Sequence, residues 1–226
     1  IGGSKAMSAA TNNYRIIFKA LEAALLIEGS AALSKEEKQG LKHWAKDYYS
    51  WLTTSQLGLQ EAASKNNHGS YYDVQALYFT LYAGYQEEAK KLAQNFVQNR
   101  LLKQIQPDGS MPEEMARTRP LFYSIYNLQA MFLVAHLAAK VEVDLWKAND
   151  PNHRLKAALD YLIPYTDPKT PWPYPAIKDA NRMDLFPILQ MAEHVYPSEN
   201  YIGYTKKLPL EKRRIERTQL ALPLMR

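Results

Sequence analysis

The chain has 226 residues, of which 46% are hydrophobic and 23% are charged, a balance typical of a folded globular domain rather than a disordered chain. Cysteine is absent, which excludes disulfides, thiolate metal sites and a cysteine nucleophile. No stretch approaches the ~20 apolar residues of a membrane-spanning helix, so we expect no membrane span. The formal net charge of +5 favours anionic partners, and both nucleic acid and acidic polysaccharide are candidates.

The N-terminal half of the chain has helical periodicity and no convincing strand. A capping-box pattern at Ser34 opens one helix, and an S-x-x-acid pattern of the same form at Ser70 opens another. Glycine follows the first and the third predicted helix, where it is a common C-terminal signal. The four predicted helices span residues 12–28, 34–59, 70–83 and 85–103.

The C-terminal half begins with a turn at Pro107–Gly109, because proline presets φ and glycine accepts a positive φ. Pro120 suits the first turn of an apolar helix, whereas Pro187 is expected to kink the helix that contains it. Four prolines in residues 167–175 predict an extended surface loop, and the tail after Tyr204 is basic and poorly periodic. The helices predicted in this half span residues 120–140, 150–164 and 179–195.

About seven helices in consecutive pairs indicate an all-α protein built as a bundle, a solenoid or an α/α toroid. A solenoid is disfavoured because the sequence has no repeat of fixed period. Seven helices are too few to close a large toroid. If the fold is a toroid, we therefore expect this chain to form only part of it.

Two polar segments lie where predicted helices begin, residues 65–70 and residues 113–123. Helix starts carry unpaired N–H donors and the positive end of the helix dipole, so both segments favour an anion such as a uronate carboxylate. The ordinary interpretation is that the first segment is a capping loop and that the second carries solvated charges. Residue types alone leave both interpretations open.

β-Elimination at a uronate requires donors that neutralise the carboxylate, a base for the C5 proton and an acid for the leaving oxygen. Asn67 and Arg117 are suitable donors, and His68 and Tyr123 are suitable proton-transfer groups. Tyr123 is also compatible with a place in the core. Glu113 and its neighbour do not favour a hydrolase, because a glycosidase needs a second carboxylate across the bond and none is indicated.

Four segments in order resemble signature sequences of the alginate lyase superfamily of α/α-toroid polysaccharide lyases. They cover roughly residues 60–150. Residues 65–68 are the first signature segment and residues 114–124 the second; residues 106–112 match the turn before the second, and the pair 126–128 and 144–146 follows it. The resemblance implies an α/α toroid, here an incomplete α/α barrel of paired antiparallel helices. It also implies one lyase domain over residues 1–226, forming the C-terminal part of a longer catalytic domain.

The resemblance further implies roles for four residues in cleavage of alginate or a related polyuronate. Asn67 and Arg117 neutralise the carboxylate, His68 is a base or second neutraliser, and Tyr123 is the acid that also serves as base in syn elimination. The six-residue step from Arg117 to Tyr123 is similar to the branch that acts on alginate and glucuronan. Strict mannuronate specificity is therefore not expected.

Several side chains are weaker candidates for contacts with the polymer, although each is also compatible with a scaffold role. These are Lys65, Asn66, Tyr72, Gln75, Arg119, Trp172 and Tyr174. The remaining histidines have no ligand spacing, so we expect no metal site, and the chemistry needs no cofactor.

Two other functions remain as alternatives: a non-catalytic protein of the same fold that binds acidic glycans, and a helical module that binds nucleic acid. No basic stripe along one helix favours the second, so we expect an acidic polysaccharide and no nucleic acid as partner. Such a polymer lies outside the cytoplasm, which favours a periplasmic or secreted protein whose export signal is not in this chain. The sequence does not indicate the oligomeric state.

Overall fold

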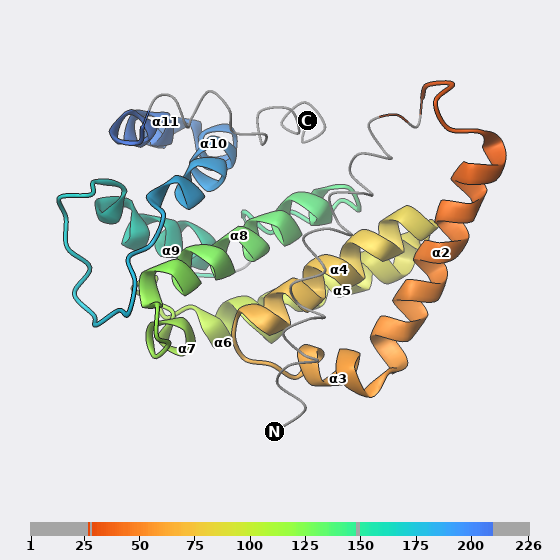
Figure 1. Ribbon diagram of the computed structural model, residues 1–226, viewed down its shortest axis with the longest axis horizontal. Helices are drawn as coiled ribbons and strands as arrows, with labels where there is room; N and C mark the ends of the chain where they lie inside the picture. The colour runs from red at the N-terminus through yellow and green to blue at the C-terminus, as the bar shows by residue number, and fades with distance from the viewer. Residues whose placement is uncertain (1–26, 28, 148–149, 210–226) are drawn as a thin grey trace.

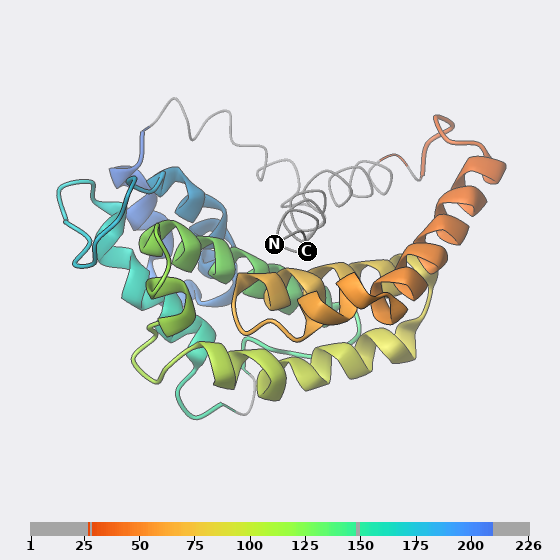
Figure 2. The same cartoon turned by 60° about the horizontal axis from the view of Figure 1, so that its bottom comes forward.

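The computed structural model describes residue 27, residues 29–147 and residues 150–209, and over these residues the protein is helical with no strand. Four helices pack side by side in one row, in the order α2, α4, α8 and α10. Three of them are backed by the helix that follows in the chain, so that α5 packs on α4, α9 on α8 and α11 on α10 (Figures 1 and 2). This two-row arrangement of helical pairs is the one expected for an α/α toroid.

The first described helices are α2 (Lys35–Thr54) and the short α3 (Gln56–Ala62). The predicted capping box is confirmed, because Ser34 accepts from the backbone N–H of Glu37 while the Glu37 carboxylate accepts from Ser34 N–H. The predicted single helix 34–59 is divided at Ser55, which ends α2 and caps α3 through its side chain. The predicted helix 12–28 lies outside the described residues, apart from residue 27.

The next helix, α4 (Asn67–Ala83), is central to the fold and begins three residues earlier than predicted. Its N-cap is Asn66, whose side chain accepts from the N–H of His68, so the Ser70 pattern lies inside the helix. The helix ends at Gly84 with a φ of 85°, as the glycine predicted. Most of its residues are buried on every side, as expected for a helix enclosed by neighbours.

Residues 86–104 form one continuous helical segment in which an α-helix changes to a π-helix. The parts are α5 (Gln86–Phe96), the π-helical η1 (Val97–Leu101) and α6 (Leu102–Gln104). The π segment carries Arg100, whose side chain is buried. Short π-helical segments inside α-helices are often found near functional sites.

The predicted turn at Pro107–Gly109 is confirmed, and Gly109 has a φ of 88°. It leads into α7 (Pro112–Met115), a short helix that the sequence did not indicate. The long apolar helix α8 (Pro120–Ala139) begins at Pro120 as expected.

Contrary to the sequence expectation, α8 is long and apolar enough to cross a membrane. Two thirds of its apolar window is buried inside the protein, against α4, α9 and α10, so here it is the central core helix.

The C-terminal part contains shorter helices than the sequence predicted. The helix α9 starts four residues later than expected, with His153 as its N-cap, and Asp150 accepts from the N–H of Arg154, its first residue. The predicted kink at Pro187 is wrong, because this proline lies in the first turn of α10, where it costs no hydrogen bond. The elements are α9 (Arg154–Leu162), η2 (Ile163–Thr166), η3 (Arg182–Leu185), α10 (Phe186–Val195), η4 (Pro197–Glu199), α11 (Tyr201–Tyr204) and η5 (Thr205–Lys207).

Candidate active site

The first signature segment becomes the loop between α3 and α4 together with the first turn of α4. Asn66 caps the helix, and Asn67 and His68 are its first two residues. Lys65 precedes them and is exposed. The helix start that the sequence associated with an anion is therefore present, although it lies three residues before the predicted one.

Asn67 is buried and bound to a carboxylate of the second signature segment. Its backbone N–H donates to Glu114 Oε1 at 2.5 Å, and its side-chain Nδ2 lies 3.1 Å and 2.9 Å from the two carboxylate oxygens of Glu114. A primary amide has two N–H donors. The contact with Glu114 therefore leaves at most one of them for a substrate carboxylate.

His68 is partly exposed and faces a different carboxylate. Its Nδ1 lies 3.0 Å and 3.3 Å from the two carboxylate oxygens of Glu61 in α3. Glu61 is almost completely buried, with 4% of its surface exposed. One of the two ring nitrogens of His68, Nδ1, thus already has a hydrogen-bond partner within the protein.

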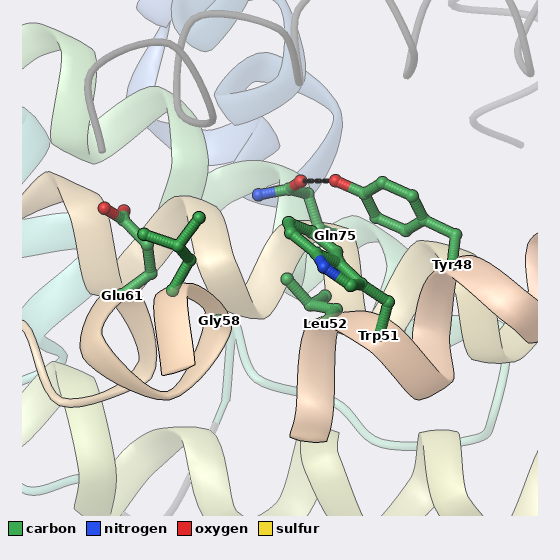
Figure 3. A pocket seen from close by; sticks show the side chains of 7 residues that line it. Tyr48, Trp51, Leu52, Gly58, Glu61 and Gln75 are labelled. Carbon is green, nitrogen blue, oxygen red and sulfur yellow. Dashed lines mark hydrogen bonds between the residues drawn. The ribbon is translucent and has the colours of Figure 1, made fainter. Parts of the chain in front are cut away.

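Glu61 also lines a pocket between α2, α3 and α4. In Figure 3, Glu61 lies at one side of this pocket and Tyr48 at the other, with the Tyr48 hydroxyl donating to Gln75. The residues that line the pocket are Tyr48, Trp51, Leu52, Leu57, Gly58, Glu61 and Gln75.

Arg117 and Tyr123 lie together at the start of α8. The Arg117 guanidinium lies over the face of the Tyr123 ring, 4.1 Å from its centroid. The next arginine, Arg119, lies in the same way over Phe122 at 4.2 Å. The six-residue step from Arg117 to Tyr123 therefore brings the two side chains into direct contact across the loop-to-helix junction.

Glu114 links the two signature segments into one cluster. Burial raises the pKa of Glu114, although hydrogen bonds from Asn67 and the nearby charges of Arg117 and His68 act to lower it. These interactions place Asn67, His68 and Arg117 around one carboxylate, and Tyr123 joins them through its contact with Arg117.

Arg100 fixes the loop that carries the first signature segment. Its guanidinium donates to the carbonyl oxygens of Ala62 and Ser64 at 2.8 Å and 3.0 Å, and its Nε donates to Asp73 in α4 at 2.6 Å. A Cβ at Gly69 would lie 2.2 Å from Ser64 O and 2.7 Å from Arg100 Nη1, so only glycine permits this approach.

The candidates for polymer contacts have different surroundings. Gln75 lines the pocket next to Glu61, whereas Tyr72 is buried against Leu52 and Ala76, which favours a packing role. Burial raises the pKa of Tyr72. Lys65 and Arg119 lie beside the signature residues in the chain.

Trp172 and Tyr174 occupy the predicted proline-rich loop. Trp172 is only partly exposed, because it packs edge-on against Tyr165 at 4.6 Å, whereas Tyr174 is 40% exposed. Tyr174 is therefore the more accessible of the two rings. Just after the loop, a hydrogen bond from Ile177 N–H to Thr118 O joins this part of the chain to the second signature segment.

Sequence reasoning missed Glu61 and Arg100, and it considered Glu114 only as a hydrolase carboxylate. Glu114 lies inside the second matched segment, which is a signal that it belongs to the site. Glu61 and Arg100 carry no such signal, because their partners come from other helices. Among the described residues, no group of three or more His, Cys, Asp or Glu side chains is arranged to hold a metal ion.

The alginate lyase family model matches residues 4–172, about three quarters of the chain. The chain belongs to the alginate lyase family. It is also similar to the crystal structure of an alginate lyase from Bacteroides ovatus, with 36% sequence identity and a TM-score of 0.76. That similarity confirms the α/α-toroid fold. No curated protein matches the chain.

The similarity covers 84% of this chain but 52% of the Bacteroides ovatus chain. The present chain thus spans about half the length of that alginate lyase. The family match includes both signature segments with Asn67, His68, Arg117 and Tyr123.

Proposed function

We propose that this chain carries the catalytic groups of a polysaccharide lyase that cleaves alginate or a related polyuronate, such as glucuronan or polymannuronate, by β-elimination. The observation that carries the proposal is the cluster around Glu114, in which residues from two distant segments meet. Membership of the alginate lyase family supports the same chemistry.

The reaction needs the negative charge of the uronate carboxylate to be neutralised before the C5 proton becomes removable. Arg117 supplies a fixed fork of donors, and Asn67 supplies the amide N–H that its contact with Glu114 leaves free. Both lie next to a helix start, where backbone N–H groups and the helix dipole favour an anion.

Elimination then moves two protons. His68, or Tyr123 in a syn elimination, takes the proton from C5, and the released electron pair forms a C4=C5 double bond as the C4–O bond breaks. The glycosidic oxygen leaves with the preceding sugar and takes a proton from Tyr123. The products are an unsaturated uronate and a new reducing end, without addition of water and without a cofactor.

The partner in this proposal is an acidic polysaccharide. Because such polymers lie outside the cytoplasm, we propose a periplasmic or secreted location. The exposed Tyr174 is a candidate ring for stacking on a sugar beside the second signature segment.

The test is to incubate the purified protein with polymannuronate, polyguluronate and glucuronan and to follow the ultraviolet absorbance of the conjugated double bond. A rise with at least one polymer supports the proposal. Binding of these polymers without any unsaturated product would favour a non-catalytic glycan-binding protein instead.

A further inference from the structure

The environment of His68 determines which of its nitrogens faces a substrate. Nδ1 lies 3.0 Å from a carboxylate oxygen of Glu61, whose side chain is 6% exposed. A carboxylate oxygen accepts and does not donate, so the hydrogen in this contact is carried by Nδ1. In the neutral imidazole, Nε2 then has a free lone pair.

We propose that Glu61 is a positioning residue that holds His68 in the Nδ1–H form and thereby makes Nε2 the base for the C5 proton. This inference rests on the proposed lyase function and goes beyond it, because the family resemblance left His68 as either a base or a neutraliser. With Nδ1 bound to Glu61, Nε2 is the ring nitrogen left for the substrate in both charge states.

The Glu61 carboxylate compensates the positive charge that the proposed step creates on His68. When the C5–H bond breaks, the proton forms a bond with Nε2 and the imidazole becomes an imidazolium. Its positive charge then lies next to the negative charge of Glu61, in a place where little water screens the attraction. Glu61 therefore stabilises the state that follows proton transfer, without itself touching the substrate.

The geometry of the Glu61–His68 pair is fixed by its supporting structure. Glu61 lies in the last turn of α3 and His68 in the first turn of α4. Arg100 binds both helices at this junction, through Ala62 O immediately after Glu61 and through Asp73 in α4. The carboxylate is thereby held at hydrogen-bond distance from the imidazole.

The surface pair His43–Asp47 provides a matched control. Its Nε2–Oδ2 distance is 3.5 Å, and both side chains are largely exposed, at 76% and 67%. Because solvent competes for both partners, this carboxylate is not expected to determine a tautomer. Asp47→Ala removes a carboxylate from beside a histidine without changing the candidate site.

The first experiment measures the tautomer of His68 by nitrogen-15 nuclear magnetic resonance at a pH where the ring is neutral, in the wild type, Glu61→Gln, Glu61→Ala and Asp47→Ala. We expect the Nδ1–H form in the wild type and in Asp47→Ala. Glu61→Gln should keep it, because the amide oxygen still accepts, whereas Glu61→Ala should lose the preference. A wild-type ring with its hydrogen on Nε2, or an unchanged tautomer in Glu61→Ala, would overturn the inference. This readout does not depend on lyase activity.

The second experiment measures turnover of a uronate polymer by the same proteins. We expect Glu61→Ala to lower kcat by about tenfold or more with little change in KM, because an incorrectly oriented base affects proton transfer rather than binding. Glu61→Gln should recover part of the loss, and Asp47→Ala should equal the wild type. Wild-type kcat in Glu61→Ala would refute the role of Glu61, whereas an inactive wild type would count against the proposed function instead.

Discussion

Replacement of Glu114 tests the cluster that joins the two signature segments. Glu114 is fully buried and accepts from the backbone N–H and the side-chain amide of Asn67. Glu114→Ala leaves both donors buried without a partner, at a cost of about 1–3 kcal/mol each. We therefore expect its free energy of unfolding to fall by about 2–6 kcal/mol relative to the wild type.

The more conservative Glu114→Gln tests the electrostatic part of this account. Burial raises the pKa of Glu114 above the ordinary value of 4.5, so the folded protein holds this proton more tightly than the unfolded chain. Its contribution to stability is therefore present below the unfolded pKa and is lost as pH rises through the folded pKa. In Glu114→Gln the side chain at position 114 does not titrate. The amount by which the free energy of unfolding of the wild type exceeds that of this variant should therefore shrink as pH rises.

The assay is urea unfolding, followed by circular dichroism between about pH 4 and about pH 8, for the wild type, Glu114→Gln and Glu114→Ala. Glu113→Gln is the matched control, because its neighbouring carboxylate is exposed. Its pH profile should follow that of the wild type. If the advantage of the wild type over Glu114→Gln grew with pH, the raised pKa would be wrong. If Glu114→Ala cost no stability, the proposed link between the segments would be refuted.

Three further predictions concern the site and its support. His68→Ala and Tyr123→Phe should each lower turnover by about a hundredfold or more, and normal turnover in either would remove that residue from its role. Thermal unfolding should stay close to that of the wild type in Tyr123→Phe but fall in His68→Ala, because that change leaves the buried Glu61 carboxylate without its partner. Gly69→Ala should lower the urea midpoint by an amount equivalent to about 1–3 kcal/mol, because its Cβ would lie 2.2 Å from a carbonyl oxygen of the preceding loop; an unchanged midpoint would show that this loop moves freely. Arg100→Met should cost about 1.5–3 kcal/mol in the same assay, because it removes the charged hydrogen-bond donor of the partly buried Asp73 carboxylate in α4, and wild-type stability would contradict this.

The elements that the sequence predicted correctly have local causes. The capping box at Ser34, the left-handed glycines at positions 84 and 109 and the helix start at Pro120 each depend on residues a few positions apart. The predicted start of α4 was wrong because two possible capping residues lie close together in the sequence, and Asn66 rather than Ser70 caps the helix. The π-helical register of residues 97–101 has no recognised local signal.

The candidate site likewise contains residues that the sequence predicted and residues that it did not. Asn67, His68, Arg117 and Tyr123 were nominated from motifs that lie within short stretches of sequence. The groups that hold them depend on packing between separate helices: Glu61 acts from α3 and Arg100 from a π-helical segment. One sequence gives no direct information on such contacts, so these supporting residues required the structure.

The most direct test of the central claim is the mass of the products formed from a uronate polymer. β-Elimination adds no water, so the account predicts oligosaccharides that carry an unsaturated terminal sugar and are lighter by one water than the corresponding hydrolysis products. Tyr123→Phe should not produce them. Saturated oligosaccharides of the full hydrolytic mass would contradict the assignment of this chain as a lyase.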